Sequence, residues 1–109
     1  MTDVYRIECT AEFDRWLNRV PNRPMRFSII RKIRAIAREG HLLGDWKQVA
    51  NGVFELRFRD EARHRVYLAR RGYRLVLLLG GAGRIRGADA VRAAHLWRRW
   101  KKLHGNRIF

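Results

Sequence analysis

VFELRFRDEARHRVYLARRGYRLVLLL, residues 53–79, is the stretch of sequence that decides the fold. Its apolar and polar side chains alternate with the period of two that is typical of β-strands. Polar and glycine-containing segments interrupt the alternation twice, which predicts three antiparallel strands at Val53–Arg59, Arg63–Ala69 and Tyr73–Leu79. The last of these is apolar on both faces in its second half, as expected of a central strand.

The same alternation assigns side chains to the two faces of the sheet. Phe54, Leu56 and Phe58 share one face, and Val66 and Leu68 are expected to join them in the core. The residues assigned to the opposite face are Glu55, Arg57, Arg59, Arg63, Arg65 and Tyr67. That face therefore carries four guanidinium groups on neighbouring strands.

The flanking segments predict a further strand and three helices. The strand is expected at Val4–Glu8. The helices are expected from Ala11 onward behind a Thr10 cap, over about Met25–Glu39 and over about Ala88–Leu103. Loops are expected over Gly40–Gly52 and Gly80–Gly83. The side chains expected to point inward from the last helix are Val91, Ala94, Trp97 and Trp100.

The element order β-α-α-β-β-β-α predicts an α+β fold with a small, mostly antiparallel sheet. We expect the helices to pack on one face of this sheet and to leave the other face largely open. A chain of 109 residues is too short for two independent cores, so residues 1–109 are taken as a single domain.

Residue usage limits the class of protein. The one cysteine, Cys9, excludes an internal disulfide framework and a Cys-based zinc site, and it is expected to be a small buried side chain. The N-terminus lacks the pattern of a secretory signal, and the longest apolar run, Leu75–Leu79, is too short to cross a bilayer. These features predict a cytoplasmic protein without membrane association.

The charge of the chain indicates an anionic partner. Lys and Arg total 25 against 10 Asp and Glu, a net charge of +15. From residue 62 onward, 13 basic residues stand against one acid, Asp89, so this part alone carries +12. Most of the cations are Arg, whose planar fork matches phosphate and stacks on bases. This favours binding to nucleic acid or to a ribosome, although an acidic protein partner fits the same surface.

Two interpretations of the arginine-rich sheet face are open. Crowded guanidinium groups repel one another, which destabilises the fold. Binding of an anionic ligand would offset this repulsion, so the first interpretation is a binding face. The alternative is an ordinary solvated face, partly neutralised by Glu55, Asp60 and Glu61.

Five short motifs follow one another along nearly the whole chain. They are Phe13-x-x-Trp16-Leu17, Gly44-Asp45-Trp46-Lys47-Gln48-Val49, Gly52-Val53-Phe54-Glu55-Leu56-Arg57, Arg65-Val66-Tyr67 and Leu77-Leu78-Leu79-Gly80-Gly81. In this order they resemble signatures of the RelE/ParE superfamily. The branch that they resemble most is the addiction module killer protein group, which is similar to HigB toxins.

The resemblance implies a RelE/ParE-like toxin that is neutralised by a cognate antitoxin of the helix-turn-helix type. RelE-like and HigB-like members cleave messenger RNA in the ribosomal A site without a metal, so no cofactor is expected. A ribose 2′-hydroxyl attacks the adjacent phosphate and expels the 5′-oxygen of the next nucleotide. Such a step needs cations around the phosphate, a proton acceptor and a proton donor.

The resemblance and the strand alternation together nominate the site residues. Arg57 and Arg65 match the family's sheet cations and are expected to contact phosphate, and Glu55 is either a base or the partner that orients Arg57. The catalytic candidates are Arg57, Arg65, Glu55, His64 and Tyr67. The candidates for RNA binding are Lys47, Arg59, Arg63, Arg84, Arg86 and Trp46. Histidine changes charge near neutral pH, but the alternation places His64 on the core side.

The chain departs from this branch in two loops. The branch has Gly-Pro-Gly-Tyr-Arg where this chain has Glu61-Ala62-Arg63-His64-Arg65. After Gly80-Gly81 the usual Asp-Lys and Gln are replaced by Ala82-Gly83 and Arg86, while Asp89 is retained. Two alternatives therefore stand beside a ribosome-dependent endoribonuclease. One is a non-catalytic protein that binds RNA or an acidic antitoxin, and the other is a ParE-like inhibitor of DNA gyrase.

Overall fold

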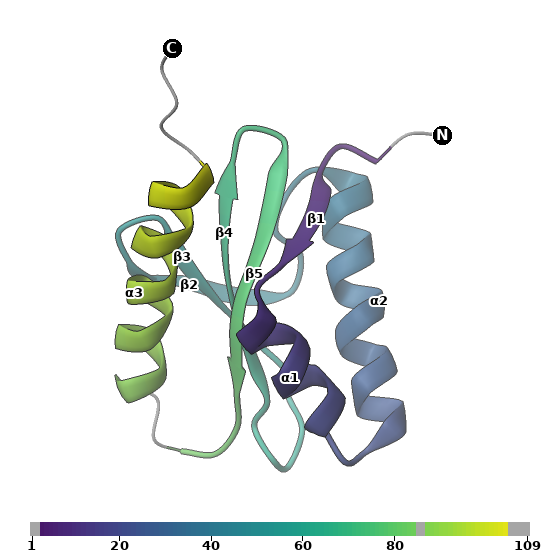
Figure 1. The fold of residues 1–109 in the computed structure, drawn as a ribbon. Helices are drawn as coiled ribbons and strands as arrows, with labels where there is room; N and C mark the ends of the chain where they lie inside the picture. The colour runs from purple at the N-terminus through teal and green to yellow at the C-terminus, as the bar shows by residue number, and fades with distance from the viewer. Residues whose placement is uncertain (1–2, 85–86, 105–109) are drawn as a thin grey trace.

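The computed structural model describes residues 3–84 and 87–104. Its elements are β1 (Arg6–Cys9), α1 (Ala11–Arg19), α2 (Arg23–Glu39), β2 (Asp45–Ala50), β3 (Val53–Arg57), β4 (Arg65–Arg71), β5 (Arg74–Gly81) and α3 (Gly87–His104). The strands form one sheet in the order β1-β5-β4-β3-β2 (Figure 1). β1 pairs with β5 in parallel, and the other three pairings are antiparallel. The predicted α+β class and mostly antiparallel sheet are confirmed.

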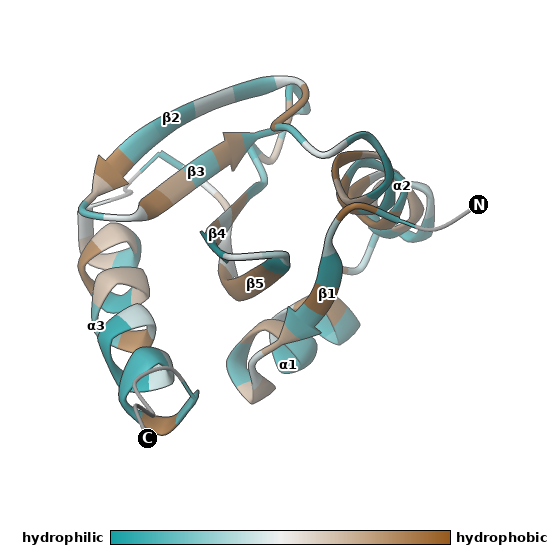
Figure 2. Ribbon diagram, turned by 90° about the horizontal axis from the view of Figure 1, so that it is seen from above, coloured by the Kyte–Doolittle hydropathy of each residue, from teal (hydrophilic) through white to brown (hydrophobic). Residues whose placement is uncertain are grey.

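Helices cover both faces of the sheet, so the expectation of helices on one face only is wrong. α1 and α2 lie on one side and α3 lies on the other (Figure 2). The sheet face beneath α3 is apolar at Val53, Ala69 and Val76, and these side chains are fully buried. Within the described ranges, no helix is long and apolar enough to cross a membrane.

The first core lies between the sheet and the pair α1 and α2. Its buried residues are Phe13, Val20, Ile29, Ile33, Ile36, Leu42, Leu56, Val66, Leu68, Leu75 and Leu77. The face predicted from strand alternation is therefore confirmed. The predicted Thr10 cap is also present, because its hydroxyl accepts a bond from the N–H of Phe13 (3.0 Å) and donates one to the carbonyl of Leu78 (2.7 Å). This residue both starts α1 and ties it to β5.

The second core lies between α3 and the opposite sheet face. Trp97 and Trp100 stack with ring centroids 5.4 Å apart. The other buried members are Val53, Tyr67, Ala69, Val76, Leu78, Leu79, Ala93 and Leu96. The prediction of an inward Val91 is wrong, because the buried stripe runs through Ala93 and Leu96 and leaves Val91 71% exposed.

The segment predicted as a loop over residues 40–52 contains an additional strand. β2 pairs with β3 in antiparallel register, with Lys47 opposite Glu55 and Trp46 opposite Leu56. β2 is an edge strand with three exposed residues in a row, so its side chains show little of the alternation that marks a half-buried strand. Its place is fixed by backbone pairing to β3, which sequence pattern does not report.

Cys9 is exposed at the end of β1, contrary to the expectation that it is buried. The expectation failed because β1 is an edge strand. Partial desolvation of the thiol, together with the nearby carboxylate of Asp14, raises the pKa of Cys9 to about 11. The reactive thiolate form is therefore disfavoured.

Gly80 on β5 leaves room for the indole ring of Trp16 on α1. A Cβ atom at residue 80 would come within 2.0 Å of that ring. We expect Gly80→Ala to lower the free energy of unfolding by about 1–3 kcal/mol, the usual cost of overpacking, as measured by urea denaturation. Gly87→Ala is the control, because its methyl group would meet nothing within 4 Å. Equal stability of the two variants would mean that Trp16 moves aside without cost.

Candidate anion-binding cleft

A cleft of about 700 Å³ lies at the end of the sheet where β3 ends and β4 begins. Its lining residues are Asp45, Arg57, Phe58, Arg59, Asp60, Arg63, His64, Arg65, Gly83 and Arg84. All four arginines predicted for one sheet face are among them. They therefore converge, but around a cleft at the end of strands β3 and β4 and not across an uncovered face.

Backbone hydrogen bonds shape the loop between β3 and β4. The N–H of Phe58 donates to the carbonyl of His64 (2.9 Å), and the N–H of Arg63 donates to the carbonyl of Asp60 (3.1 Å). Arg63 has a φ of 56°, in the left-handed region that non-glycine residues seldom adopt. The N–H of Gly83 donates to the carbonyl of Ala62 (2.8 Å), which joins this loop to the one after β5.

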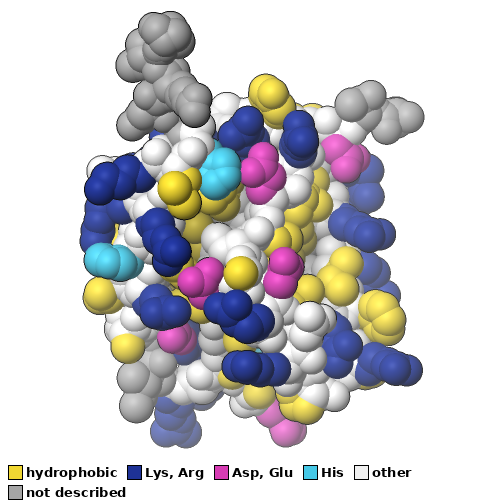
Figure 3. All heavy atoms as spheres, in the orientation of Figure 1, with side chains coloured by type: hydrophobic (Ala, Val, Ile, Leu, Met, Phe, Trp, Pro, Cys, Tyr) yellow, Lys and Arg dark blue, Asp and Glu magenta, His cyan; other side chains and the backbone are white. Residues whose placement is uncertain are grey.

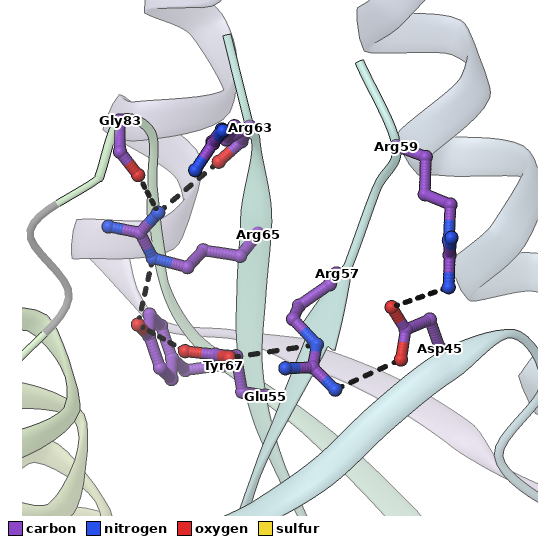
Figure 4. Close-up of polar contacts among 8 residues, drawn as sticks. All are labelled: Asp45, Glu55, Arg57, Arg59, Arg63, Arg65, Tyr67 and Gly83. Carbon is purple, nitrogen blue, oxygen red and sulfur yellow. Dashed lines mark hydrogen bonds and ion pairs between the residues drawn. The ribbon is translucent and has the colours of Figure 1, made fainter. Parts of the chain in front are cut away.

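Asp45 at the start of β2 holds two of the arginines. Its carboxylate lies 3.0 Å from a terminal nitrogen of Arg57 and 3.5 Å from a terminal nitrogen of Arg59 (Figure 4). The side chain of Arg57 is 30% exposed, whereas that of Arg59 is 87% exposed. Arg57 is therefore a partly desolvated cation held by a close ion pair, and Arg59 is a largely exposed one at the rim.

Arg65 is buried, which corrects its placement on an open face. Its side chain is only 2% exposed. The acceptors around its guanidinium group are the hydroxyl of Tyr67 (3.0 Å), the carbonyls of Arg63 (3.2 Å), Gly83 (2.7 Å) and Ala82 (3.5 Å), and the carboxylate of Asp89 (3.1 Å). These five contacts match the five N–H donors of a guanidinium. Arg65 therefore joins the two loops and α3, and has no donor left over for a phosphate.

Tyr67 and Glu55 lie beneath the cleft, and the prediction that they face outward into an open surface is wrong. Tyr67 is fully buried and Glu55 is 1% exposed. The hydroxyl of Tyr67 donates to Glu55 Oε2 (2.9 Å), and Glu55 Oε1 lies 4.0 Å from Nε of Arg57 (Figure 4). Burial raises the pKa of Tyr67 well above its usual value, and the hydrogen bond to Glu55 raises it further. Tyr67 therefore contacts Arg65, Glu55 lies beside Arg57, and the bond between Tyr67 and Glu55 links the two arginines.

His64 and Asp60 form a hydrogen-bonded pair within the lining of the cleft. Nδ1 of His64 pairs with Asp60 Oδ2, and the backbone N–H of His64 donates to Asp60 Oδ1 (2.9 Å). Burial alone would raise the pKa of Asp60, but the hydrogen bonds and charge of His64 hold it below its usual value. The imidazole also meets the ring of Trp16 edge-on, with centroids 6.1 Å apart. His64 is therefore buried, as the alternation predicts, and still lines the cleft.

The remaining candidates divide between the cleft and other surfaces. Arg84 lines the cleft with the sheet arginines. Trp46 and Lys47 lie on β2 outside the lining, where Trp46 contacts Phe54 edge-on at 5.6 Å. Arg86 lies outside the described residues. Among those that are described, no group of three or more His, Cys, Asp or Glu side chains could hold a metal ion.

Sequence reasoning missed the acidic residues that organise the site. The sequence pattern places Asp45 in a loop, indicates for Asp60 only a neutralising charge, and marks Asp89 only as a position shared with the family that the chain resembles. Asp60 carries a usable signal, because it precedes His64 by four residues across a tight turn. The contact between Asp45 and Arg57 depends on the pairing of β2 with β3, and no local pattern reveals it.

Comparison with known proteins gives one informative relative. A protein of Haemophilus influenzae (strain ATCC 51907 / DSM 11121 / KW20 / Rd) is 33% identical over 91 residues, which cover 84% of this chain and 90% of the relative. The chain belongs to the family of that protein. The relative is described as "Uncharacterized protein", so the shared family adds no activity. No family model matches the chain, and no solved structure matches it.

Proposed function

We propose that this family member is the toxin of a type II toxin–antitoxin system and acts as a ribosome-dependent endoribonuclease on messenger RNA. The observation that carries the proposal is the cleft that gathers Arg57, Arg59, Arg63 and Arg84 around a His–Asp pair. The motifs that resemble the RelE/ParE superfamily support the same assignment. The chemistry is attack of a ribose 2′-hydroxyl on the adjacent phosphate, which this chain would perform without a cofactor.

The cleft suits a phosphate group because its cations are accessible and incompletely neutralised. Arg63 and Arg84 are exposed, and among the described residues no acid lies within ion-pair distance of either. Asp45 holds Arg57 in place, so the Arg57 side chain loses little conformational entropy when a phosphate binds. Guanidinium groups in a partly dehydrated site stabilise the charge that develops on a phosphate under attack.

The wider surface fits a large polyanion such as the ribosome. On the face seen in Figure 3, Lys and Arg side chains outnumber acidic ones and lie both along α3 and near the lower end of the molecule. The net charge of +15 would draw such a partner and would also attract an acidic antitoxin. We therefore propose the cognate antitoxin, the ribosome and messenger RNA as partners.

Binding to RNA is tested first with a double variant at the rim of the cleft. Arg59→Gln/Arg84→Gln removes two accessible cations, and we expect weaker binding of a short single-stranded RNA in a fluorescence anisotropy titration. Because each lost phosphate contact lowers the salt slope for a single strand by about 0.7, the double variant should lower it by about 1.4. Arg31→Gln/Arg34→Gln on the exposed side of α2 is the control, since it removes the same charge elsewhere. Equal slopes for both double variants would contradict the cleft as the binding site.

Cleavage is tested with translating ribosomes in a purified translation system. We expect the wild-type protein to cut the translated messenger RNA within codons, and the rim double variant to cut it more slowly than the α2 control. Binding without any cleavage would support the non-catalytic alternative. Loss of supercoiling by DNA gyrase, with intact messenger RNA, would support a ParE-like activity.

A further inference from the structure

We propose that the His64–Asp60 pair is the proton-accepting group of this cleft, with Nε2 of His64 as the base that takes the proton of the attacking 2′-hydroxyl. This inference rests on the proposed endoribonuclease activity and names the group that performs its first proton transfer. Asp60 is a positioning residue in this assignment, because it contacts the imidazole and not the RNA.

The contacts with Asp60 determine which ring nitrogen of His64 carries the proton. The carboxylate of Asp60 forms two hydrogen bonds with His64, one to the ring Nδ1 and one to the backbone N–H (2.9 Å). An ionised carboxylate accepts hydrogen bonds only, so Nδ1 must carry a proton. In the neutral imidazole Nε2 is then the acceptor. The low pKa of Asp60 keeps this arrangement in place at neutral pH.

The surroundings hold the imidazole firmly in one orientation. His64 is 7% exposed and meets Trp16 of α1 edge-on. The charged groups that share the cleft with it are Asp60, Asp45, Arg57, Arg59, Arg63, Arg84 and the buried Arg65. A base beside several guanidinium groups is well placed, since the same cations attract the phosphate whose neighbouring hydroxyl must be deprotonated.

Competing bases fit less well. Glu55 is buried, with one carboxylate oxygen bonded to Tyr67 and the other facing Arg57. Asp45 is occupied by two arginines. His64 is the one described lining residue whose side chain ordinarily changes charge between about pH 5 and 8, the range in which a general base is most effective.

The step balances without a metal or a co-reactant. Nε2 accepts the proton as the 2′-oxygen forms a bond to phosphorus, and the bond from phosphorus to the 5′-oxygen of the next nucleotide breaks. The leaving oxygen takes a proton from solvent water, and the imidazolium returns its proton to the solvent. The products are a 2′,3′-cyclic phosphate and a 5′-hydroxyl end.

The test measures single-turnover cleavage of translated messenger RNA by His64→Gln and Asp60→Asn. We expect His64→Gln to lower the rate about 100-fold or more, the usual contribution of a general base. Asp60→Asn should also lower it, because the Asn amide can donate to Nδ1 and shift the ring proton to Nε2. His95→Gln, which alters an exposed histidine on α3, should cleave at the wild-type rate.

Two further readouts separate catalysis from folding and binding. The pH profile of the cleavage rate should differ between the wild-type protein and His64→Gln, because a general base acts only in its unprotonated form. Binding of an RNA with 2′-deoxyribose at the cut site should be unchanged in both variants. If the wild-type protein cleaves and either His64→Gln or Asp60→Asn cleaves equally fast, the His64–Asp60 pair is not the base. The proposed endoribonuclease activity would be unaffected by that result. Absence of cleavage by the wild-type protein would overturn both.

Discussion

Arg65→Met is expected to lower the free energy of unfolding by about 3–5 kcal/mol, the cost of removing one partner from a buried ion pair. Arg65 is 2% exposed and bridges the loop before β4, the loop after β5 and Asp89 in the first turn of α3. Methionine fills a similar volume but satisfies none of these acceptors. Urea denaturation followed by tryptophan fluorescence measures the change.

The matched control is Arg70→Met on the same strand. Arg70 is exposed, with one long hydrogen bond to Tyr5 (3.4 Å) and a contact with the ring of Phe54 at 5.2 Å. Its replacement should cost less than about 1 kcal/mol. Equal losses for the two variants would mean that the Arg65 network contributes nothing specific.

The burial of Arg65 also limits what its variants can report in a test of the proposed toxin activity. Loss of the proposed activity in an Arg65 variant would not distinguish a lost fold from a lost phosphate contact, because this side chain is buried and holds two loops to α3. The accessible cations Arg57, Arg59, Arg63 and Arg84 are the informative positions.

Arg57→Gln is expected to slow cleavage of translated messenger RNA by about 100- to 1000-fold, the usual effect of losing one preorganised donor to a developing negative charge. Asp45 lies 3.0 Å from this guanidinium group and Glu55 lies 4.0 Å from its Nε, so both acids position it in the cleft without any ligand. Such a group loses little freedom in the transition state. Single-turnover cleavage at saturating protein measures the effect.

Arg59→Gln is the comparison, because Arg59 shares the same carboxylate but is 87% exposed. Its loss should weaken RNA binding more than it slows the cleavage step. Arg57→Lys retains the charge without the planar fork and should restore part of the rate. If Arg59→Gln slows single-turnover cleavage as much as Arg57→Gln does, the preorganisation of Arg57 is not what the reaction uses.

The alternation of β3 and β4 predicted the core correctly because it depends on a local geometric rule. Successive side chains of a strand point to opposite faces, and Leu56, Val66 and Leu68 are buried as that rule requires. The rule does not say what covers the second face. Val53, Ala69 and Val76 are apolar there and lie under α3, whereas Arg57 and Arg65 line the cleft.

The sequence by itself determined the α+β class, the capped start of α1, the apolar core face of β3 and β4, and the convergence of the arginines of these neighbouring strands. Each follows from neighbours within a few residues or from the total charge. Only the tertiary structure decided which arginines are accessible in the cleft and which one is buried as a structural contact. That choice depends on Asp45 and Asp89, which reach the cleft from an edge strand and from α3. Contacts between segments far apart in the chain set the burial and the partners of a charged side chain, and its local pattern carries no record of them.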